Sequence, residues 1–164
     1  MARILHSWIV SFCWRLGKTE GTLHKLHKQT VAEELQKKSY GIHFEPWESP
    51  LKLLWWQSYK PDILAIKQTN SSRRIVLVEC ETNPSRKRVL GKAKQIKKNL
   101  AIQKQLFADT MILPLLVIPP NNLQKMMFSH VRKFWEIWII SQEGQIKHKI
   151  PRTPASGSLG SFDW

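Results

Sequence analysis

Three acidic residues lie beside two short apolar segments near the middle of the chain. Asp62 directly precedes the segment 63–66, and the segment 75–78 is followed by Glu79 and Glu81. If the two segments pair as a hairpin that turns symmetrically about positions 70 and 71, Asp62 faces Glu79, and Glu81 projects to the same side as Glu79. Like charges that face one another on paired strands are destabilising, so these carboxylates need a bound cation or a shared proton. The spacing therefore predicts a site for a divalent cation.

A fourth acidic residue, Glu34, lies on the apolar side of an expected helix. Apolar residues from Leu23 to Leu35 form a stripe on this helix, and at 100° per residue Glu34 falls near the middle of the stripe. A buried carboxylate is costly unless it is paired, hydrogen-bonded or metal-bound. Glu34 therefore either joins the cation site or pairs with one of the 26 basic residues. His27 shares this side of the helix and is expected to be a core histidine.

Alternating helices and strands are expected to position these acids. The strand, long helix and apolar strand that follow one another after residue 75 predict a crossover with parallel neighbouring strands. We therefore expect an α/β fold in which a central mixed β-sheet is flanked by helices on both faces.

The expected elements are a helix over 23–38, an edge strand over 42–47, a loop at 53–59, the hairpin of 63–66 and 75–78, a long amphipathic helix from about 86 to 107, a strand over 111–118, a helix over 122–134 and a strand over 136–140.

The charge balance points to a polyanionic partner. The 26 Lys and Arg residues exceed the 12 Asp and Glu residues, which gives a net charge of +14 and a pI near 10.1. Eight basic residues and no acidic residue lie between positions 82 and 108, so one side of the long helix can follow phosphates. A merely solvated helix face is the alternative. The expected nucleic-acid contacts are Arg86, Lys87, Arg88, Lys94, Lys97, Lys98 and Lys104.

The length of 164 residues suits one domain, which we expect over 21–150, with an apolar arm or helix at 1–20 and a flexible tail at 151–164.

Cys13 and Cys80 have no partner at metal-ligand spacing, which favours a reducing cell interior over a disulfide framework or a zinc site. The apolar start lacks a clear cleavage site, and no apolar run approaches the length of a transmembrane helix. We expect an intracellular, cytoplasmic protein without stable membrane insertion; an interfacial helix at 1–14 that binds anionic lipid is the alternative.

Two segments carry a resemblance to a known family. Lys-Pro-Asp-Ile-Leu-Ala-Ile over 60–66, followed by Val-Leu-Val-Glu-Cys-Glu-Thr over 76–82, resembles the PD-(D/E)XK nuclease motif. The resemblance implies a restriction-endonuclease-like core and hydrolysis of nucleic acid phosphodiester bonds. It also implies that Glu34, Asp62 and Glu79 hold Mg²⁺ or Mn²⁺. The acid-X-acid-Thr ending is similar to variants seen among proteins of archaeal plasmids and viruses.

One position departs from this motif. The family usually places a Lys two residues after the second acid, where this chain has Glu81. Lys92 and Gln95, on the helix that follows, are the candidates to supply the missing polar group. Glu81 is then expected to bind the metal or its water. All six acidic and helical candidates (Glu34, Asp62, Glu79, Glu81, Lys92 and Gln95) are treated as catalytic residues.

The sequence therefore favours a metal-dependent DNA endonuclease. The alternative is a nuclease-fold protein without turnover that acts as a basic nucleic-acid-binding or replication accessory module. A homodimer is compatible with either function, and the choice between DNA and RNA is not fixed by the sequence.

Overall fold

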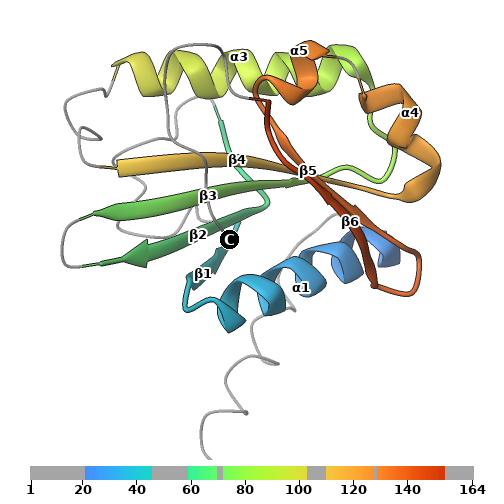
Figure 1. Cartoon of the computed structure of the whole chain (residues 1–164), viewed down its shortest axis with the longest axis horizontal. Helices are drawn as coiled ribbons and strands as arrows, with labels where there is room; N and C mark the ends of the chain where they lie inside the picture. Colours follow the sequence, from blue (N-terminus) through green and yellow to red (C-terminus); the bar gives the residue numbers. More distant parts are fainter. Residues whose placement is uncertain (1–20, 46–58, 70–71, 103–109, 128, 154–164) are drawn as a thin grey trace, which may run out of the picture.

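The computed structural model describes residues 21–45, 59–69, 72–102, 110–127 and 129–153 (Figure 1). The expected arm at 1–20, the hairpin turn at 70–71, most of the loop at 53–59, the end of the long helix after residue 102 and the tail from residue 154 lie outside these residues. Within the described ranges, no helix is both long enough and apolar enough to cross a membrane.

A six-stranded mixed sheet forms the centre of the molecule, with its strands in the order β1-β2-β3-β4-β5-β6. β1, β2 and β3 are antiparallel neighbours, β3, β4 and β5 are parallel, and β6 returns antiparallel to β5. The parallel pair β3 and β4 is joined through the long helix, as the expected crossover requires. The strands are β1 (Gly41–Phe44), β2 (Ile63–Gln68), β3 (Arg73–Cys80), β4 (Thr110–Ile118), β5 (Glu136–Ile140) and β6 (Ile146–Ile150).

The hairpin of β2 and β3 has the register that places Asp62 opposite Glu79. Ile63 pairs with Val78, and Ile66 pairs with Ile75. Both strands are almost wholly buried apart from their ends next to the turn. The register expected from the two apolar segments is confirmed.

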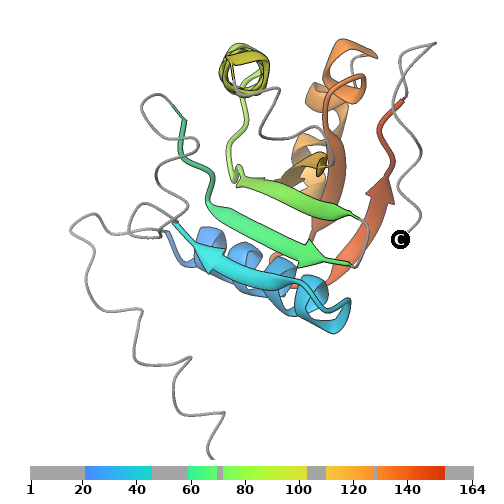
Figure 2. The same ribbon diagram turned by 90° about the vertical axis from the view of Figure 1, so that its left-hand side faces the viewer.

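Two helices cover opposite faces of the sheet, as Figure 2 shows. α1 (Thr22–Lys37) packs Val31 and Leu35 on one face of the sheet. They lie against Val76, Val78 and other strand residues whose side chains point to this face. α3 (Arg86–Ile102) packs Val89, Ala93 and Ile96 on the other face, against Ile75, Leu77 and their neighbours. Because side chains alternate along a strand, Glu79 and Glu81 follow Ile75 and Leu77 to the α3 face. The expected α/β fold with helices on both faces is confirmed.

The expected helix over 122–134 is wrong as a single element. A 3₁₀ turn (Pro120–Asn122) leads into α4 (Leu123–Met126), and α5 (Ser129–Arg132) follows separately. Met126 and Val131 are both fully buried in the core under α3. One continuous helix would point these two side chains about 140° apart, so both can enter the core only if the helix breaks.

A candidate active site between β2, β3 and α3

Backbone hydrogen bonds fix Asp62 against the end of β3. Its N–H donates to the carbonyl of Val78 at 3.0 Å, and its Oδ2 accepts from the N–H of Cys80 at 2.7 Å. The second bond aligns the Asp62 carboxylate with the part of β3 that carries Glu79. The structure therefore brings together the two acids that the hairpin register paired.

Glu79 and Glu81 are buried, with 0% and 1% of their surfaces exposed. Neither carboxylate is therefore solvated at the end of β3. Lys92 on α3 approaches both carboxylates from above the sheet: its Nζ contacts Glu79 Oε2 and lies 3.0 Å from Glu81 Oε1. The Lys92 ammonium thus lies beside Glu81, the residue at which the sequence departs from the motif that it resembles.

Arg88 closes the site on the solvent side. Its Nη2 lies 2.6 Å from Glu81 Oε2, and it precedes Lys92 by one turn of α3. The two side chains are on the same flank of the helix because residues four apart are neighbours on a helix surface. The sequence placed Arg88 among the nucleic-acid contacts and did not indicate its contact with Glu81.

Two further residues border the site and were missed by sequence reasoning. His24, in the first turn of α1, has its Nε2 3.5 Å from Asp62 Oδ1. Tyr59 is buried, and burial together with the charge of Glu79 raises the pKa of its hydroxyl well above the ordinary value. Tyr59 stands three residues before Asp62, and this proximity in sequence was the one available signal. His24 is far from the motif in sequence, so nothing short of the fold indicates it.

Burial and the neighbouring charged or hydrogen-bonding groups act in opposite directions on the pKa values of the site. Burial raises the pKa of Glu79 to about 7, although the Lys92 ammonium opposes this. Burial also acts to raise the pKa of Asp62, but hydrogen bonds from His24 and from the Cys80 N–H outweigh it and hold that pKa below its usual value. For Lys92, burial is outweighed by attraction to Glu79 and Glu81, and its pKa lies above the ordinary value. Lys92 is therefore a cation at neutral pH.

Glu34 does not join this group. Its Oε1 accepts a hydrogen bond from Lys149 Nζ of β6 at 2.8 Å, and its Oε2 lies 3.8 Å from Lys37 Nζ. Since His24 of α1 contacts Asp62, Glu34 lies ten residues further, or about 15 Å, along the helix axis. The hydrogen bond from Lys149 is the main reason that the pKa of Glu34 lies below its usual value. The sequence correctly required an inward partner for Glu34, but that partner is a lysine, so we remove Glu34 from the candidate metal ligands.

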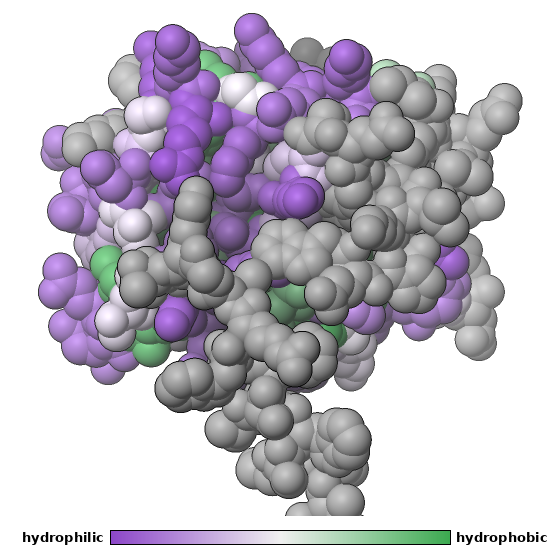
Figure 3. Space-filling view, turned by 180° about the vertical axis from the view of Figure 1, so that it is seen from behind, coloured by the Kyte–Doolittle hydropathy of each residue, from purple (hydrophilic) through white to green (hydrophobic). Residues whose placement is uncertain are grey.

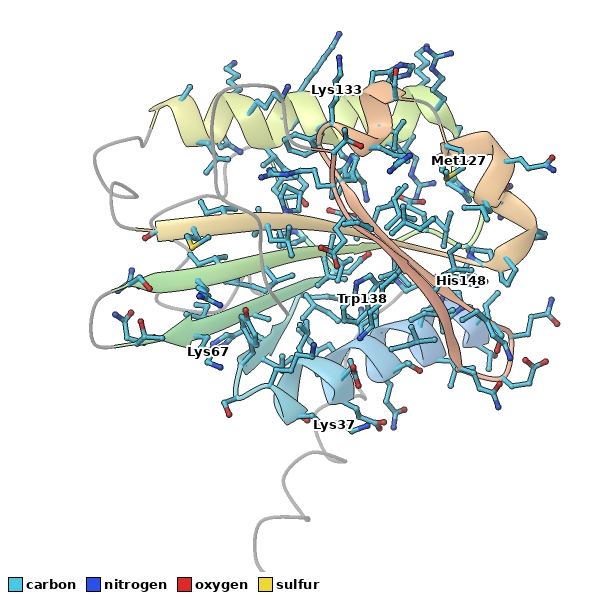
Figure 4. All side chains as sticks on the ribbon, in the orientation of Figure 1. Lys37, Lys67, Met127, Lys133, Trp138 and His148 are labelled. Atoms are coloured by element: carbon cyan, nitrogen blue, oxygen red, sulfur yellow. The ribbon has the colours of Figure 1, made fainter. Side chains whose placement is uncertain are left out.

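The remaining helical candidates are exposed on α3. Gln95 follows Lys92 by almost one turn and is exposed, as are Lys87, Lys94 and Lys98. Figure 3 shows hydrophilic side chains gathered along the side of the molecule where α3 lies, and Lys133, labelled in Figure 4, lies on the same side. Three of the predicted nucleic-acid contacts differ in setting: Arg86 donates from Nε to His130 Nε2 at 2.8 Å, Lys97 lies 5.4 Å above the Phe134 ring, and Lys104 lies outside the described residues.

The donors at this site suit a divalent cation in kind and in charge. Mg²⁺ and Mn²⁺ prefer carboxylate oxygens, and Asp62, Glu79 and Glu81 supply them. The raised pKa of Glu79 means that this carboxylate gains from additional positive charge. Among the described residues, no three His, Cys, Asp or Glu side chains form a ready-made ligand set. Lys92 and Arg88 contact oxygens of Glu79 and Glu81 in this structure.

No protein-family model matches the chain, and no curated protein sequence matches it. The solved structures that match the chain include the following two. One is an XisH family protein from Nostoc punctiforme, with 15% identity and a TM-score of 0.46 over 76% of this chain and 98% of that chain. The other is an fdxN element excision controlling factor protein from Anabaena variabilis, with 13% identity and a TM-score of 0.46 over 77% of this chain and 98% of that chain. At these identities and scores, neither match assigns a family or an activity to this chain.

Proposed function

We propose that the chain is a metal-dependent nuclease of the PD-(D/E)XK kind that hydrolyses DNA phosphodiester bonds. The observation that carries the proposal is the meeting of Asp62, Glu79 and Lys92 at one point, from two strands and a helix. This is the set of two acids and one lysine that the motif requires, with the lysine supplied by α3 in place of position 81. An intracellular location, where DNA is available, goes with this proposal.

Each residue has a defined task in such a site. Asp62, held by backbone groups of β3, and Glu79 would hold Mg²⁺ or Mn²⁺, and Glu81 would hold the metal or its water. When bound, the cation supplies an activated water and offsets phosphate charge. Lys92 stays protonated next to the carboxylates, so it serves to stabilise negative charge on the phosphate and not to remove a proton.

The exposed basic residues of α3 supply the binding surface. Lys87, Lys94 and Lys98 recur at spacings that place them along one flank of the helix. Each phosphate that they neutralise steepens the loss of affinity with salt by about 0.9 in logarithmic units. This surface lies on the flank of α3 next to Arg88 and Lys92, the two residues of the helix that contact the carboxylates.

A DNA-binding module without turnover is the second candidate. The observation that favours it is the pairing of Glu79 and Glu81 with Lys92 and Arg88, which neutralises the carboxylates without a metal. The two candidates differ in one result, because the module binds DNA with and without Mg²⁺ and never cleaves it.

Cleavage of supercoiled plasmid and branched DNA, with Mg²⁺ or Mn²⁺ and with EDTA, tests the proposal. We expect cation-dependent cleavage that Asp62→Ala and Glu79→Ala each reduce by at least about 100-fold. Glu34→Gln is the matched control, because the sequence grouped this acid with the others and the structure places it elsewhere; it should cleave like the wild type. Cleavage that survives both alanine substitutions would eliminate the site.

A further inference from the structure

The ion pair between Arg88 and Glu81 joins an exposed group to a buried one. The Arg88 side chain is 59% exposed, whereas the Glu81 side chain is 2% exposed. The guanidinium can therefore leave the pair and remain hydrated, but the carboxylate cannot. Glu81 loses one of its two cationic partners when Arg88 moves away, because Lys92 Nζ lies 3.0 Å from the other Glu81 oxygen. A further cation at the vacated oxygen would restore the compensation of this buried charge.

The other cation on α3 is held more firmly. Lys92 contacts both Glu79 and Glu81, and its side chain is 25% exposed. Arg88 contacts one carboxylate oxygen, Oε2 of Glu81. A divalent cation that binds between the carboxylates would bring two positive charges close to Lys92 and Arg88. Arg88 is the one that can yield, because it has one carboxylate partner here and direct access to solvent.

A released Arg88 would stay beside the basic flank of the helix. Arg88 and Lys92 lie on one flank of α3, and Lys87, Lys94 and Lys98 lie on the next, about 100° around the axis. Arg88 thus stands between the carboxylates and the surface proposed to follow the DNA backbone. Its planar guanidinium can bind a phosphate through two parallel hydrogen bonds, which an ammonium group cannot do.

We propose that Arg88 exchanges partners, binding Glu81 in the absence of a divalent cation and a DNA phosphate beside the site when the cation is bound. This inference rests on the proposed function and adds a coupling to it. Because linkage is reciprocal, the cation raises the affinity for DNA, and DNA raises the affinity for the cation. Arg88 thereby holds the buried carboxylate while the site lacks its metal and contributes to substrate binding once the metal is present.

Calorimetric titration of Mn²⁺ into the DNA-free protein tests the first half of the exchange. Arg88→Gln removes the competitor for Glu81, so it should bind Mn²⁺ about 5-fold or more tightly than the wild type. Lys87→Gln makes the same change of charge at an exposed neighbouring position and should alter the affinity less than Arg88→Gln. Unchanged or weaker Mn²⁺ binding by Arg88→Gln, in a wild type that binds Mn²⁺, would overturn the exchange.

DNA affinity in EDTA tests the second half without any metal. Glu81→Gln should release Arg88 and tighten binding of a labelled duplex, measured by fluorescence anisotropy. The same substitution in an Arg88→Gln background removes one negative charge but has no Arg88 to release, so its gain should be smaller. Equal gains in the two backgrounds would refute the release of Arg88.

The two measurements separate this inference from the proposed nuclease. If neither the wild type nor Arg88→Gln binds Mn²⁺, the metal site fails and the metal-linked exchange fails with it. If Arg88→Gln alone binds Mn²⁺, Arg88 blocks the site and does not yield to the cation, so the exchange is refuted. If Mn²⁺ binds equally to both proteins, the nuclease proposal stands and the exchange is refuted.

Discussion

Glu79→Gln should make the protein more stable, and the gain should grow with pH. Glu79 has a pKa of about 7 in the folded state, against an ordinary value of 4.5. The folded state therefore binds this proton more tightly than the unfolded chain does, so stability is lost as the pH rises from about 4.5 through 7. Glutamine keeps the shape of the protonated side chain and cannot ionise, so the variant escapes this loss.

The size of the gain follows from the two pKa values. A difference of one pKa unit is worth about 1.4 kcal/mol, so ionised Glu79 costs about 3 kcal/mol of folding free energy at pH 8 and about 1 kcal/mol at pH 5. The attraction of Lys92 is already contained in the pKa of about 7. We therefore expect Glu79→Gln to exceed the wild type by roughly 2 kcal/mol more at pH 8 than at pH 5.

Urea unfolding at the two pH values, in buffers free of divalent cations, measures this difference. Glu33→Gln makes the same substitution at an exposed position of α1 and is the control; its difference from the wild type should vary less between pH 5 and pH 8 than that of Glu79→Gln. A stability difference between Glu79→Gln and the wild type that is the same at pH 5 and pH 8 would refute the account of a buried, insufficiently paired carboxylate.

Further predictions concern the surface, the second acid pair and a turn. Lys94→Ala with Lys98→Ala should weaken DNA binding and flatten its salt dependence, by about 0.9 in logarithmic slope for each phosphate that is no longer neutralised. Lys149→Met should lower stability by about 1 kcal/mol, because it removes the partner of Glu34 together with a cation-π contact, and should leave cleavage unchanged. Gly144→Ala should cost about 1–3 kcal/mol in urea unfolding, because Gly144 has φ +78° and an added Cβ would lie 3.0 Å from a side chain of α1.

Each of these has a matched comparison. Lys37→Ala removes a charge from α1 and should change DNA binding and its salt dependence less than the α3 substitutions do. An equal effect of Lys37→Ala would mean that net charge, and not α3, controls binding. Loss of cleavage in folded Lys149→Met would contradict the separation of Glu34 from the active site, and an unaltered Gly144→Ala protein would contradict the strain assigned to that turn.

The hairpin and its acids were predictable because their pattern is local. Two apolar segments of similar length fix a register by themselves, since a slip of one residue would turn every side chain to the wrong face. The alternation of side chains then placed Glu79 and Glu81 on one face without further information. Lys92 was predicted as a candidate because it lies close in sequence, on the following helix. Its contact with both carboxylates depends on how α3 packs against the sheet.

The predictions that were wrong or missing depend on contacts between residues far apart in the sequence. A helical wheel places Glu34 on the inward side of α1 but does not say which strand lies opposite, and β6 supplies Lys149 there. β6 itself was missed because its pattern has apolar residues only at its ends, as suits an exposed edge strand. The contact of Arg88 with Glu81 was missed for a related reason, because a run of basic residues does not reveal which of them turns inward.

Anomalous scattering from crystals soaked in Mn²⁺ tests the proposed metal site most directly, because it locates the cation independently of turnover. We predict a peak within coordination distance of carboxylate oxygens of both Asp62 and Glu79, with the Arg88 guanidinium displaced from Glu81. A soaked crystal in which Mn²⁺ binds elsewhere, or in which Lys92 and Arg88 keep their carboxylate contacts at saturating Mn²⁺ and no peak is found, would contradict the proposed site.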